Sequence, residues 1–446
     1  MDPSSGLVAE GPEPLTFDGL RRSLSRTWQA TRKLLRRPLR PRGLDATPNG
    51  HRPLVARLPP ELIDHIVDHF HGDKNTLMNL SLVCHALVPS ARYHLFDRLK
   101  ISSSNVRKIS ALFADGTPEI ALYVRELTLE AGDGRSDQVF SELRGIQSGK
   151  PLRTLLRMFF LVIAPHTRNV ERLVLTAVPL EKNIVGMLAP CFPKLNMLSL
   201  FDCSFRCNAD LDKLVRDHPR IHTLRAGRVC SVYGLAPSDS TDVIGPRLAL
   251  RQLKVTEAYS PSPLTLMPWL FEHCSPEHFV YTFYRLGQFP KINNAIIDMK
   301  SLTHLHLIMY RWRTDDMREL EAEPSLVTII PPYPSRITTM TLDGKMHMLN
   351  LVVTILAQLE PNWFVQLHTL NLWVHLDEKD VSKVDPITWT GMDQRLSVLH
   401  SLRVVNFYNS CQRTDHIHSG TEAIGARLPT LNFRRMLRFQ DLEPPF

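Results

Sequence analysis

A short apolar pattern recurs along most of this 446-residue chain. In each copy, apolar residues stand at a first position s and again at s+3 and s+5, the spacing typical of one short strand in a repeating unit. After residue 120 we assign nine windows to this template, and a tenth, FVYTFY, fits only in its alternation. The nine windows begin at Val124, Val170, Leu195, Ile221, Leu250, Leu302, Ile337, Leu367 and Leu402, and the tenth begins at Phe279.

The spacing of the windows and the segments between them indicate the architecture. Most successive windows start one repeat of about 20 to 29 residues apart, or one repeat with a short insertion. Helix-like stretches such as 181–190, 209–218, 348–359 and 391–400 lie between them. Alternation of strand and helix at this period predicts parallel strands on one face and helices on the other.

The window at Leu195 is the best formed. It has apolar or ladder residues at every position of the leucine-rich repeat pattern, namely Leu195, Leu198, Leu200, Cys203 and Phe205. We therefore expect residues 99–446 to form an irregular, leucine-rich repeat-like α/β solenoid with parallel strands. We expect long loops around residues 131–151, 228–249, 311–336 and 376–388.

Side chains at s+2, s+4 and s+6 should point away from the core, because successive residues of a strand face opposite sides. On a solenoid these positions form the open, concave face. Exposed aromatic and basic residues there suit the recognition of another protein, although some of the aromatics could instead pack under insertion loops. The candidate target-binding residues are Phe201, Arg225, Lys254, Tyr281, Phe283, Arg285, His304, His306, Trp373 and Tyr408.

Residues 57–96 have a different pattern, with three short helical segments. Pro59 and Pro60 precede a helix whose apolar stripe runs from Leu62 to Phe70, and Gly72 breaks it. A second apolar run extends from position 77 to 87, and a third short helix is expected from position 90. Three helices in about 40 residues bury too little surface for a robust domain, so this segment is predicted to be a docking module.

The string LPPELIDHI and the later SLVC resemble the F-box. The longer segments LPPELIDHIVDH and SLVCHALVPSARYHLF, together with RLPTLNFRRMLRF late in the chain, resemble the large F-box family of basidiomycete fungi. The resemblance implies docking onto the Skp-type adaptor of a cullin-RING ubiquitin ligase, with targets presented by the C-terminal repeats. Leu87 stands where the family commonly has a tryptophan, so the module lacks that aromatic anchor. The positions carried over as partner-docking residues are Leu58, Pro59, Leu62, Ile63, Ile66, Val83, Cys84 and Leu87.

The formal net charge is +8, and it is concentrated near the N-terminus. Residues 19–44 contain nine Arg and Lys residues and no acid, so the remainder of the chain is close to balanced. This argues against a globular domain that tracks nucleic acid phosphates, and any binding of nucleic acid or an anionic membrane is assigned to residues 19–44. We interpret residues 1–50 as a disordered basic arm, with an F-box-like helical domain over 54–98; a nuclear-import signal or a partner-binding helix are the alternatives within the arm.

The sequence contains no motif for catalysis or for a cofactor. The seven cysteines show neither a disulfide framework nor paired zinc-ligand spacing, and His65 and His69 lack the HExxH order. Phosphate-binding loops, a GxSxG elbow and RING or HECT cysteine patterns are absent from the sequence. We therefore expect no catalytic, metal or cofactor site, and, with no signal peptide or apolar span, a soluble cytoplasmic and/or nuclear protein.

Three functional hypotheses follow. The first is a non-enzymatic substrate-recognition adaptor of an SCF-type ubiquitin ligase, which binds the Skp-type adaptor through the F-box and an unidentified protein substrate through the repeats. The second is an F-box-like repeat scaffold that acts outside a ligase. The third is a polyanion- or membrane-binding protein led by the basic arm.

Overall fold

The computed structural model describes residues 58–114, 118–131, 150–231, 247–256, 267–310, 329, 335–344, 349–374, 378–409 and 417–440. The chain divides into two compact units, Met1–Ile63 and Asp64–Phe446. The predicted basic arm, including residues 19–44, lies outside the described residues, as do most of the long loops expected at 131–151, 228–249 and 311–336. The domain boundaries at 1–50, 54–98 and 99–446 stay predictions.

Three short helices occupy the segment in which three were predicted. They are α2 (Pro60–Asp68), α3 (Lys74–Val83) and α4 (Val88–Phe96). Asp73 caps α3, since its carboxylate accepts hydrogen bonds from the amides of Asn75 and Thr76 at 3.0 and 3.1 Å. Pro89 lies in the first turn of α4, where its missing N–H costs nothing, so it begins a helix rather than ending the one before it.

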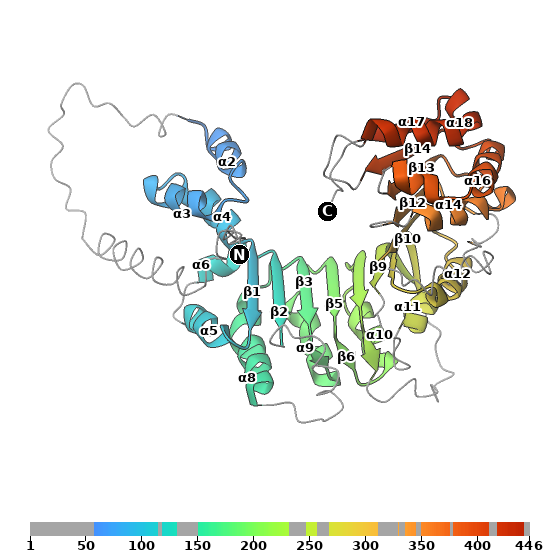
Figure 1. The fold of residues 1–446 in the computed structure, drawn as a ribbon. Coiled ribbons are helices and arrows are strands. Elements are labelled where there is room, and N and C mark those ends of the chain that lie inside the picture. The colour runs from blue at the N-terminus through green and yellow to red at the C-terminus, as the bar shows by residue number, and fades with distance from the viewer. Residues whose placement is uncertain are drawn as a thin grey trace, which may run out of the picture. The chain divides into compact units, whose positions relative to one another are not determined.

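A single sheet of twelve parallel strands follows, and its strand order is the order of the sequence (Figure 1). Each of the ten predicted windows overlaps one strand, which confirms the repeat pattern, and the edge strands β1 and β15 were not predicted. The strands are β1 (Arg98–Ser102), β2 (Glu126–Glu130), β3 (Arg172–Thr176), β5 (Met197–Phe201), β7 (Thr223–Gly227), β9 (Leu248–Thr256), β10 (Cys274–Phe283), β11 (His304–Met309), β12 (Thr339–Gly344), β13 (Thr369–Val374), β14 (Val404–Asn409) and β15 (Leu437–Gln440).

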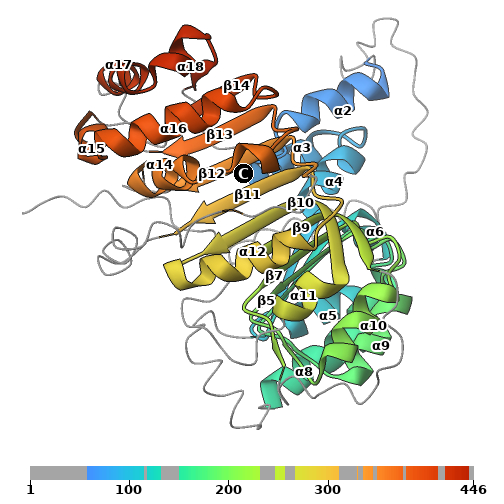
Figure 2. The ribbon, with the colours of Figure 1, turned by 90° about the vertical axis from the view of Figure 1, so that its right-hand side faces the viewer.

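Helices connect most of these strands, and Figure 2 shows α11 and α12 beside β9 and β10. The predicted helical stretches are confirmed, whereas the loop expected at 376–388 is corrected, because it contains α15 and the start of α16. The helices are α5 (Val106–Ala114), α6 (Pro118–Tyr123), α8 (Lys150–Met158), α9 (Lys182–Cys191), α10 (Asn208–Arg216), α11 (Met267–His273), α12 (Phe289–Ile297), α14 (Leu349–Ala357), α15 (Glu378–Lys383), α16 (Pro386–Val398), α17 (Ile417–Arg427) and α18 (Pro429–Phe433). Shorter helical segments are the π-helical η2 (Phe159–Ile163) and the 3-10 helices η3 (Ala164–His166), η4 (Leu286–Gln288) and η6 (Pro361–Trp363).

The most regular repeats are those of β3, β5 and β7, which end in the same turn. The residue after each strand, Ala177, Asp202 or Arg228, has a φ of 56, 55 or 53°. The amide of Ala177 donates to the carbonyl of Phe201 at 2.8 Å, and the amide of Asp202 donates to the carbonyl of Gly227 at 2.9 Å. The left-handed turn thus redirects the chain while its amide stays paired. A three-stranded parallel sheet follows these turns, made of β4 (Pro179–Leu180), β6 (Ser204–Phe205) and β8 (Cys230–Ser231).

The core is built from the s+3 and s+5 side chains, as the template predicts. From β2 to β14, each s+3 residue is at most 1% exposed. These residues are Leu127, Leu173, Leu198, Leu224, Leu253, Phe279, Leu305, Met340, Leu370 and Val405, which are aligned across the sheet by strand pairing. One continuous hydrophobic cluster therefore supports the sheet from Ile101 to Met436.

Cys203 occupies the repeat position predicted for it. Its side chain is fully buried, and its Sγ donates to the carbonyl of Leu175 at 3.3 Å. Burial raises the pKa of this thiol to about 12. Cys203 thus acts as a structural residue of the repeat.

Candidate functional site

The docking residues predicted on the first helices differ in their exposure. On α2, Leu62 is 49% exposed and Ile66 is 44% exposed, while Val83 at the end of α3 is 65% exposed. Leu58 is 39% exposed and Pro59 is also exposed. Large apolar side chains are thus left facing solvent on these helices, although burial of each would stabilise the fold by about 1.5 to 3 kcal/mol.

Three of the predicted docking residues are less accessible. Ile63 and Leu87 are 5% and 6% exposed, and Cys84 is half-buried. Leu87 therefore lies in the interior and presents no anchor to a partner. The prediction that Ile63 and Leu87 offer their side chains to a partner is corrected by their burial.

The charged face of α2 also has structural contacts. Ser90 of α4 donates a hydrogen bond to the carboxylate of Asp64. Asp68 is 2.7 Å from Nε2 of His94, also on α4. The second half of α2 is thereby tied to α4 by polar contacts, and both aspartates help to hold the helices together.

On the sheet, the side chains at s+2, s+4 and s+6 form a face opposite the core, which we call the open face. Its rows are aligned by strand pairing, so that a residue of one strand lies beside its equivalent on the next. The middle row runs Lys100, Thr128, Val174, Ser199, Arg225, Lys254, Val280, His306, Thr341, Asn371, Asn406 and Arg438. Phe201, Arg225, Lys254, His304, His306, Trp373 and Tyr408 occupy the open-face positions predicted for them.

The prediction failed for Tyr281, Phe283 and Arg285. Phe279 pairs with Leu253 and Leu305, so it is an s+3 residue, and the window begins three residues earlier than predicted. Tyr281 and Phe283 are consequently core residues with no exposed surface. Arg285 follows the end of β10 and donates its backbone amide to the side chain of Gln288 at 3.1 Å. The open-face residues of β10 are His278, Val280 and Thr282.

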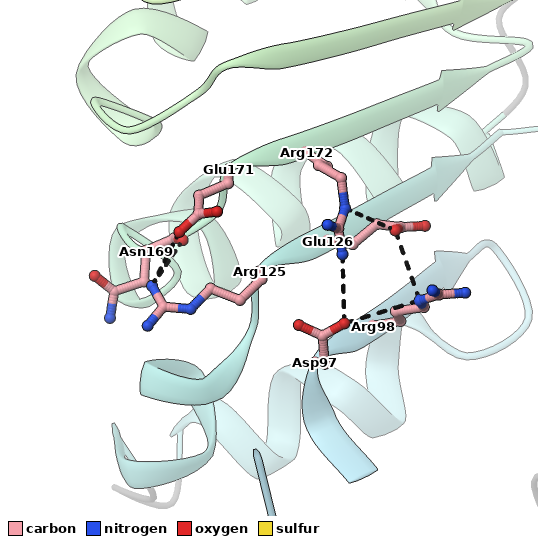
Figure 3. A network of polar contacts seen from close by, with 7 residues as sticks. All are labelled: Asp97, Arg98, Arg125, Glu126, Asn169, Glu171 and Arg172. Carbon is pink, nitrogen blue, oxygen red and sulfur yellow. Dashed lines mark hydrogen bonds and ion pairs between the residues drawn. The ribbon is translucent and has the colours of Figure 1, made fainter. Parts of the chain in front are cut away.

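The first strands of the open face carry paired charges (Figure 3). Nε of Arg172 lies 3.0 Å from the Glu126 carboxylate, and its Nη2 lies 3.4 Å from Asp97. Arg98 approaches the same two acids at 3.7 and 3.8 Å. Charges shared in this way across β1 to β3 are largely neutralised, and the network orders neighbouring strands.

The central strands differ, because histidine and arginine gather there. A pocket of about 270 Å³ opens beside the start of β7 and the middle of β9 and β10. The rings of His278 and His304, on neighbouring strands, have centroids 4.0 Å apart. Burial, and secondly the nearby His278, lowers the pKa of His304 below 6.5. The pocket is lined by His222, Thr223, Arg251, Gln252 and His278.

On the last strands the open-face positions hold aromatic and amide side chains, and two of these, Trp373 and Asn406, are buried, at 9% and 7% exposed, so the prediction that Trp373 is exposed to a target is corrected. The rings of Trp373 and Tyr408 stack with centroids 4.2 Å apart and an angle of 8°. Beside them, the side-chain amide of Asn406 donates to Asn371 at 2.8 Å, and Asn371 donates to the hydroxyl of Thr341 at 3.3 Å. Stacked rings and satisfied amides give this part of the face a defined shape.

His222, Arg251 and His278 were not among the predicted site residues. His222 and Arg251 stand at s+1, a position that the alternation rule does not assign to the open face. His278 was missed through the register of β10. One signal in the sequence could have indicated this site: a basic or imidazole side chain stands at s+1 in two consecutive windows.

Other site types were sought within the described part of the chain. There, no group of three or more His, Cys, Asp and Glu side chains is arranged to hold a metal ion. His65 and His69 lie with ring centroids 5.1 Å apart. No helix in the same residues is both long and apolar enough to cross a bilayer.

Comparisons with known proteins give little further information. No family model matches the chain, and no curated protein matches it. Among solved structures, this chain is similar to a protein chain in a crystal structure of the Rad7 and Elc1 complex in yeast, with 11% sequence identity and a TM-score of 0.31. The similarity covers 98% of this chain and 97% of that chain. A likeness at this score does not establish a shared fold, and the F-box resemblance stays a prediction.

Proposed function

We propose that this chain is the substrate-recognition adaptor of an SCF-type, cullin-RING ubiquitin ligase. Residues 58–96 dock the Skp-type adaptor, and the open face of the repeats binds the protein to be ubiquitinated. The chain itself is not an enzyme in this proposal, and ubiquitin transfer is performed by the partners.

The observation that carries the proposal is the exposure of apolar side chains at the motif positions. Leu62, Ile66 and Val83 are each more than 40% exposed. Water-facing leucine, isoleucine and valine at the positions that match a docking motif are best explained by a partner that covers them. Their burial against an adaptor would recover the hydrophobic free energy that the isolated chain forgoes.

The open face supports the second half of the proposal. It combines aromatic, basic and amide side chains on twelve parallel strands, and its rows are set in register by the backbone. Trp, Tyr and Arg are the residues that most often dominate protein interfaces. A platform of this kind suits the recognition of a protein segment.

Co-purification with a Skp-type adaptor tests the proposal. The full chain and the adaptor are co-expressed, and the double variant Leu62→Glu, Ile66→Glu is compared with the wild type. A matched control is Ile387→Glu, Val398→Glu, because these residues are 78% and 54% exposed on α16, outside the docking module. We expect the first variant to lose the adaptor and the control to keep it. Retention of the adaptor by Leu62→Glu, Ile66→Glu would overturn the proposal.

A second candidate function is a repeat scaffold that acts outside a ligase. The burial of Leu87, at 6% exposed, favours it, because the docking module then has no exposed anchor at the position of the family tryptophan. In this case adaptor binding would not survive gel filtration, and deleting residues 58–96 would not cause the target to accumulate. The ligase-adaptor proposal predicts a stable complex with the adaptor, and accumulation of the target when residues 58–96 are deleted.

A further inference from the structure

The pocket beside the start of β7 and the middle of β9 and β10 gathers donors from three separate repeats. His222 and Thr223 come from the first, Arg251 and Gln252 from the second, and His278 from the third. The side chain of Arg251 is exposed, and those of His278 and Gln252 are half-buried. Its volume of about 270 Å³ is sufficient for one side chain of a bound polypeptide. Every one of these side chains has a nitrogen or oxygen able to donate a hydrogen bond.

The surroundings of the pocket are positive or imidazole-rich. His304 extends the site to the next strand, because its ring lies 4.0 Å from that of His278. Arg225 stands next to Thr223 on the same face of β7. Its Nε atom is buried and has no hydrogen-bond partner among the described residues. An arginine nitrogen left without an acceptor favours the approach of a group that supplies one.

No acid neutralises these groups from the open face itself. Of the described open-face positions on β5 to β11, none is Asp or Glu. This is the opposite of β1 to β3, where Arg172 shares the carboxylates of Glu126 and Asp97. One acid, Glu277, stands on these strands outside the open-face positions; it is exposed, precedes His278 and lies beside Arg251 in the strand register. The charge of the central face is therefore complementary to a negatively charged partner.

We propose that the pocket of His222, Arg251 and His278 is a specificity site that binds an acidic side chain of the target protein, within a segment rich in Asp or Glu. Arg251 forms an ion pair with the carboxylate, and the two histidines donate hydrogen bonds to it. Neighbouring carboxylates of the segment bind along the row that contains Arg225. This inference rests on the proposed function in one respect, that the open face is the target-binding surface.

Binding of a carboxylate here depends on pH. An imidazole that gains a proton carries a positive charge and a second donor, so it binds a carboxylate more strongly. The other charged and titratable groups near the rings of His278 and His304 are Arg225 of β7, Arg251 and Lys254 of β9, Glu277 of β10 and His306 of β11. Affinity should rise as the pH falls from about 8 to 6.

Fluorescence anisotropy with the full chain tests the inference. The probe is a labelled peptide of alternating Glu and Gly, measured at low and at physiological salt. We expect binding that strengthens about three- to tenfold from about pH 8 to pH 6. Arg251→Gln and His278→Gln should each weaken binding by about three- to tenfold, and the second should also reduce the pH dependence. The control is Arg403→Gln, because Arg403 is also an exposed s+1 arginine and directly precedes the distant strand β14.

Several outcomes would contradict the inference. No binding of the Glu peptide, or equal binding by the wild type and Arg251→Gln, would overturn it. Stronger binding of a Lys-Gly peptide than of the Glu peptide would also overturn it. The same holds if a single-stranded oligonucleotide binds as tightly as the Glu peptide and Arg251→Gln weakens both by the same factor. Because Arg251 is exposed, its variant should keep the wild-type melting temperature. His222→Gln provides a second variant, and it is expected to weaken binding by a similar factor.

This experiment separates the pocket from the proposed ligase function. Glu-peptide binding is measured with the purified chain alone, while adaptor binding depends on Leu62 and Ile66 of the docking module. If the peptide binds through Arg251 but the adaptor does not co-purify, the inference stands and the ligase proposal fails. If the adaptor co-purifies but the peptide does not bind, the inference fails alone.

Discussion

Asp393 of α16 accepts a hydrogen bond from the backbone amide of Leu431, 3.1 Å away, at the start of α18. Its second carboxylate oxygen accepts from the amide of Thr430 at 3.0 Å. The residue at the N-cap of α18, Leu428, cannot serve as a cap, so a side chain 37 residues away in the sequence supplies the missing acceptors.

Replacing Asp393 should therefore destabilise the C-terminal repeats. Asp393 is 5% exposed, and Asp393→Ala leaves two amides without acceptors, which should lower the free energy of unfolding by about 2 to 3 kcal/mol. Asp393→Asn, which keeps one acceptor oxygen, should lower it less. Urea unfolding measures both variants, and an unchanged midpoint for Asp393→Ala would refute the capping role.

Leu198 and Met197 provide a test of the repeat core. Leu198 has no exposed surface, whereas its neighbour Met197 lies on the open face and is half-buried. Leu198→Ala should lower the free energy of unfolding by about 2 to 5 kcal/mol, since it removes buried methyl groups and leaves a cavity. Met197→Ala should cost about 1 kcal/mol or less. Equal losses in chemical denaturation would contradict the assigned register.

The cysteines should differ in reactivity. Burial raises the pKa of Cys203 and of Cys274 to about 12, so neither forms a thiolate at neutral pH. Both should resist a thiol reagent until the chain unfolds, while Cys84 and Cys207, which are half-buried, should react in the native protein. Mass spectrometry after brief alkylation identifies the labelled residues. Early labelling of Cys203 would contradict its place in the core.

His304 should make stability depend on pH. Burial and His278 lower its pKa in the folded chain below the ordinary value of 6.5. As the pH falls through 6.5, the unfolded chain binds a proton that the folded His304 does not yet bind, so the free energy of unfolding decreases. His304→Gln should reduce this decrease between about pH 7 and pH 5. Thermal unfolding across that range measures the effect, and an identical pH profile for wild type and variant would argue against it.

Much of the fold could be predicted because one period repeats. Leu195, Leu198 and Leu200 carry the pattern without help from distant contacts, and its recurrence predicts the neighbouring strands. The edge strands β1 and β15 escaped this reasoning. In β15 the first position is Arg434, so LRFQ does not fit the template and only its pairing with β14 identifies it as a strand. In β1, Phe96, Leu99 and Ile101 do fit the template, but Phe96 was assigned to the third predicted helix.

The error in β10 has a physical cause. Phe279, Tyr281 and Phe283 alternate with other residues, so they predict a strand but do not say which of them is the s+3 residue. The register is decided by pairing with β9 and β11, which aligns Phe279 with Leu253. A shift of three residues moved every side chain of β10 to the wrong face. As a result, two core aromatics were predicted to bind the target, and His278 was not.

The helices of the docking module could be predicted from the sequence, but the exposure of their individual side chains could not. The spacing of Leu62, Ile63, Ile66 and Val67 predicts one apolar stripe. In the structure Ile63 and Val67 are buried, whereas Leu62 and Ile66 are exposed. The apolar face of α2 is thus divided between the interior and the solvent, and only tertiary packing decides where that division falls.

Titration calorimetry of the purified full chain with a Skp-type adaptor tests the central claim most directly. We expect one-to-one binding with a Kd of about 10 μM or tighter and a negative heat capacity change, because apolar side chains such as Leu62 and Ile66 become buried. Leu62→Glu, Ile66→Glu should abolish the heat, while Arg251→Gln should leave it unchanged. Absence of binding at an adaptor concentration of about 100 μM, or wild-type binding by the double variant, would contradict the account.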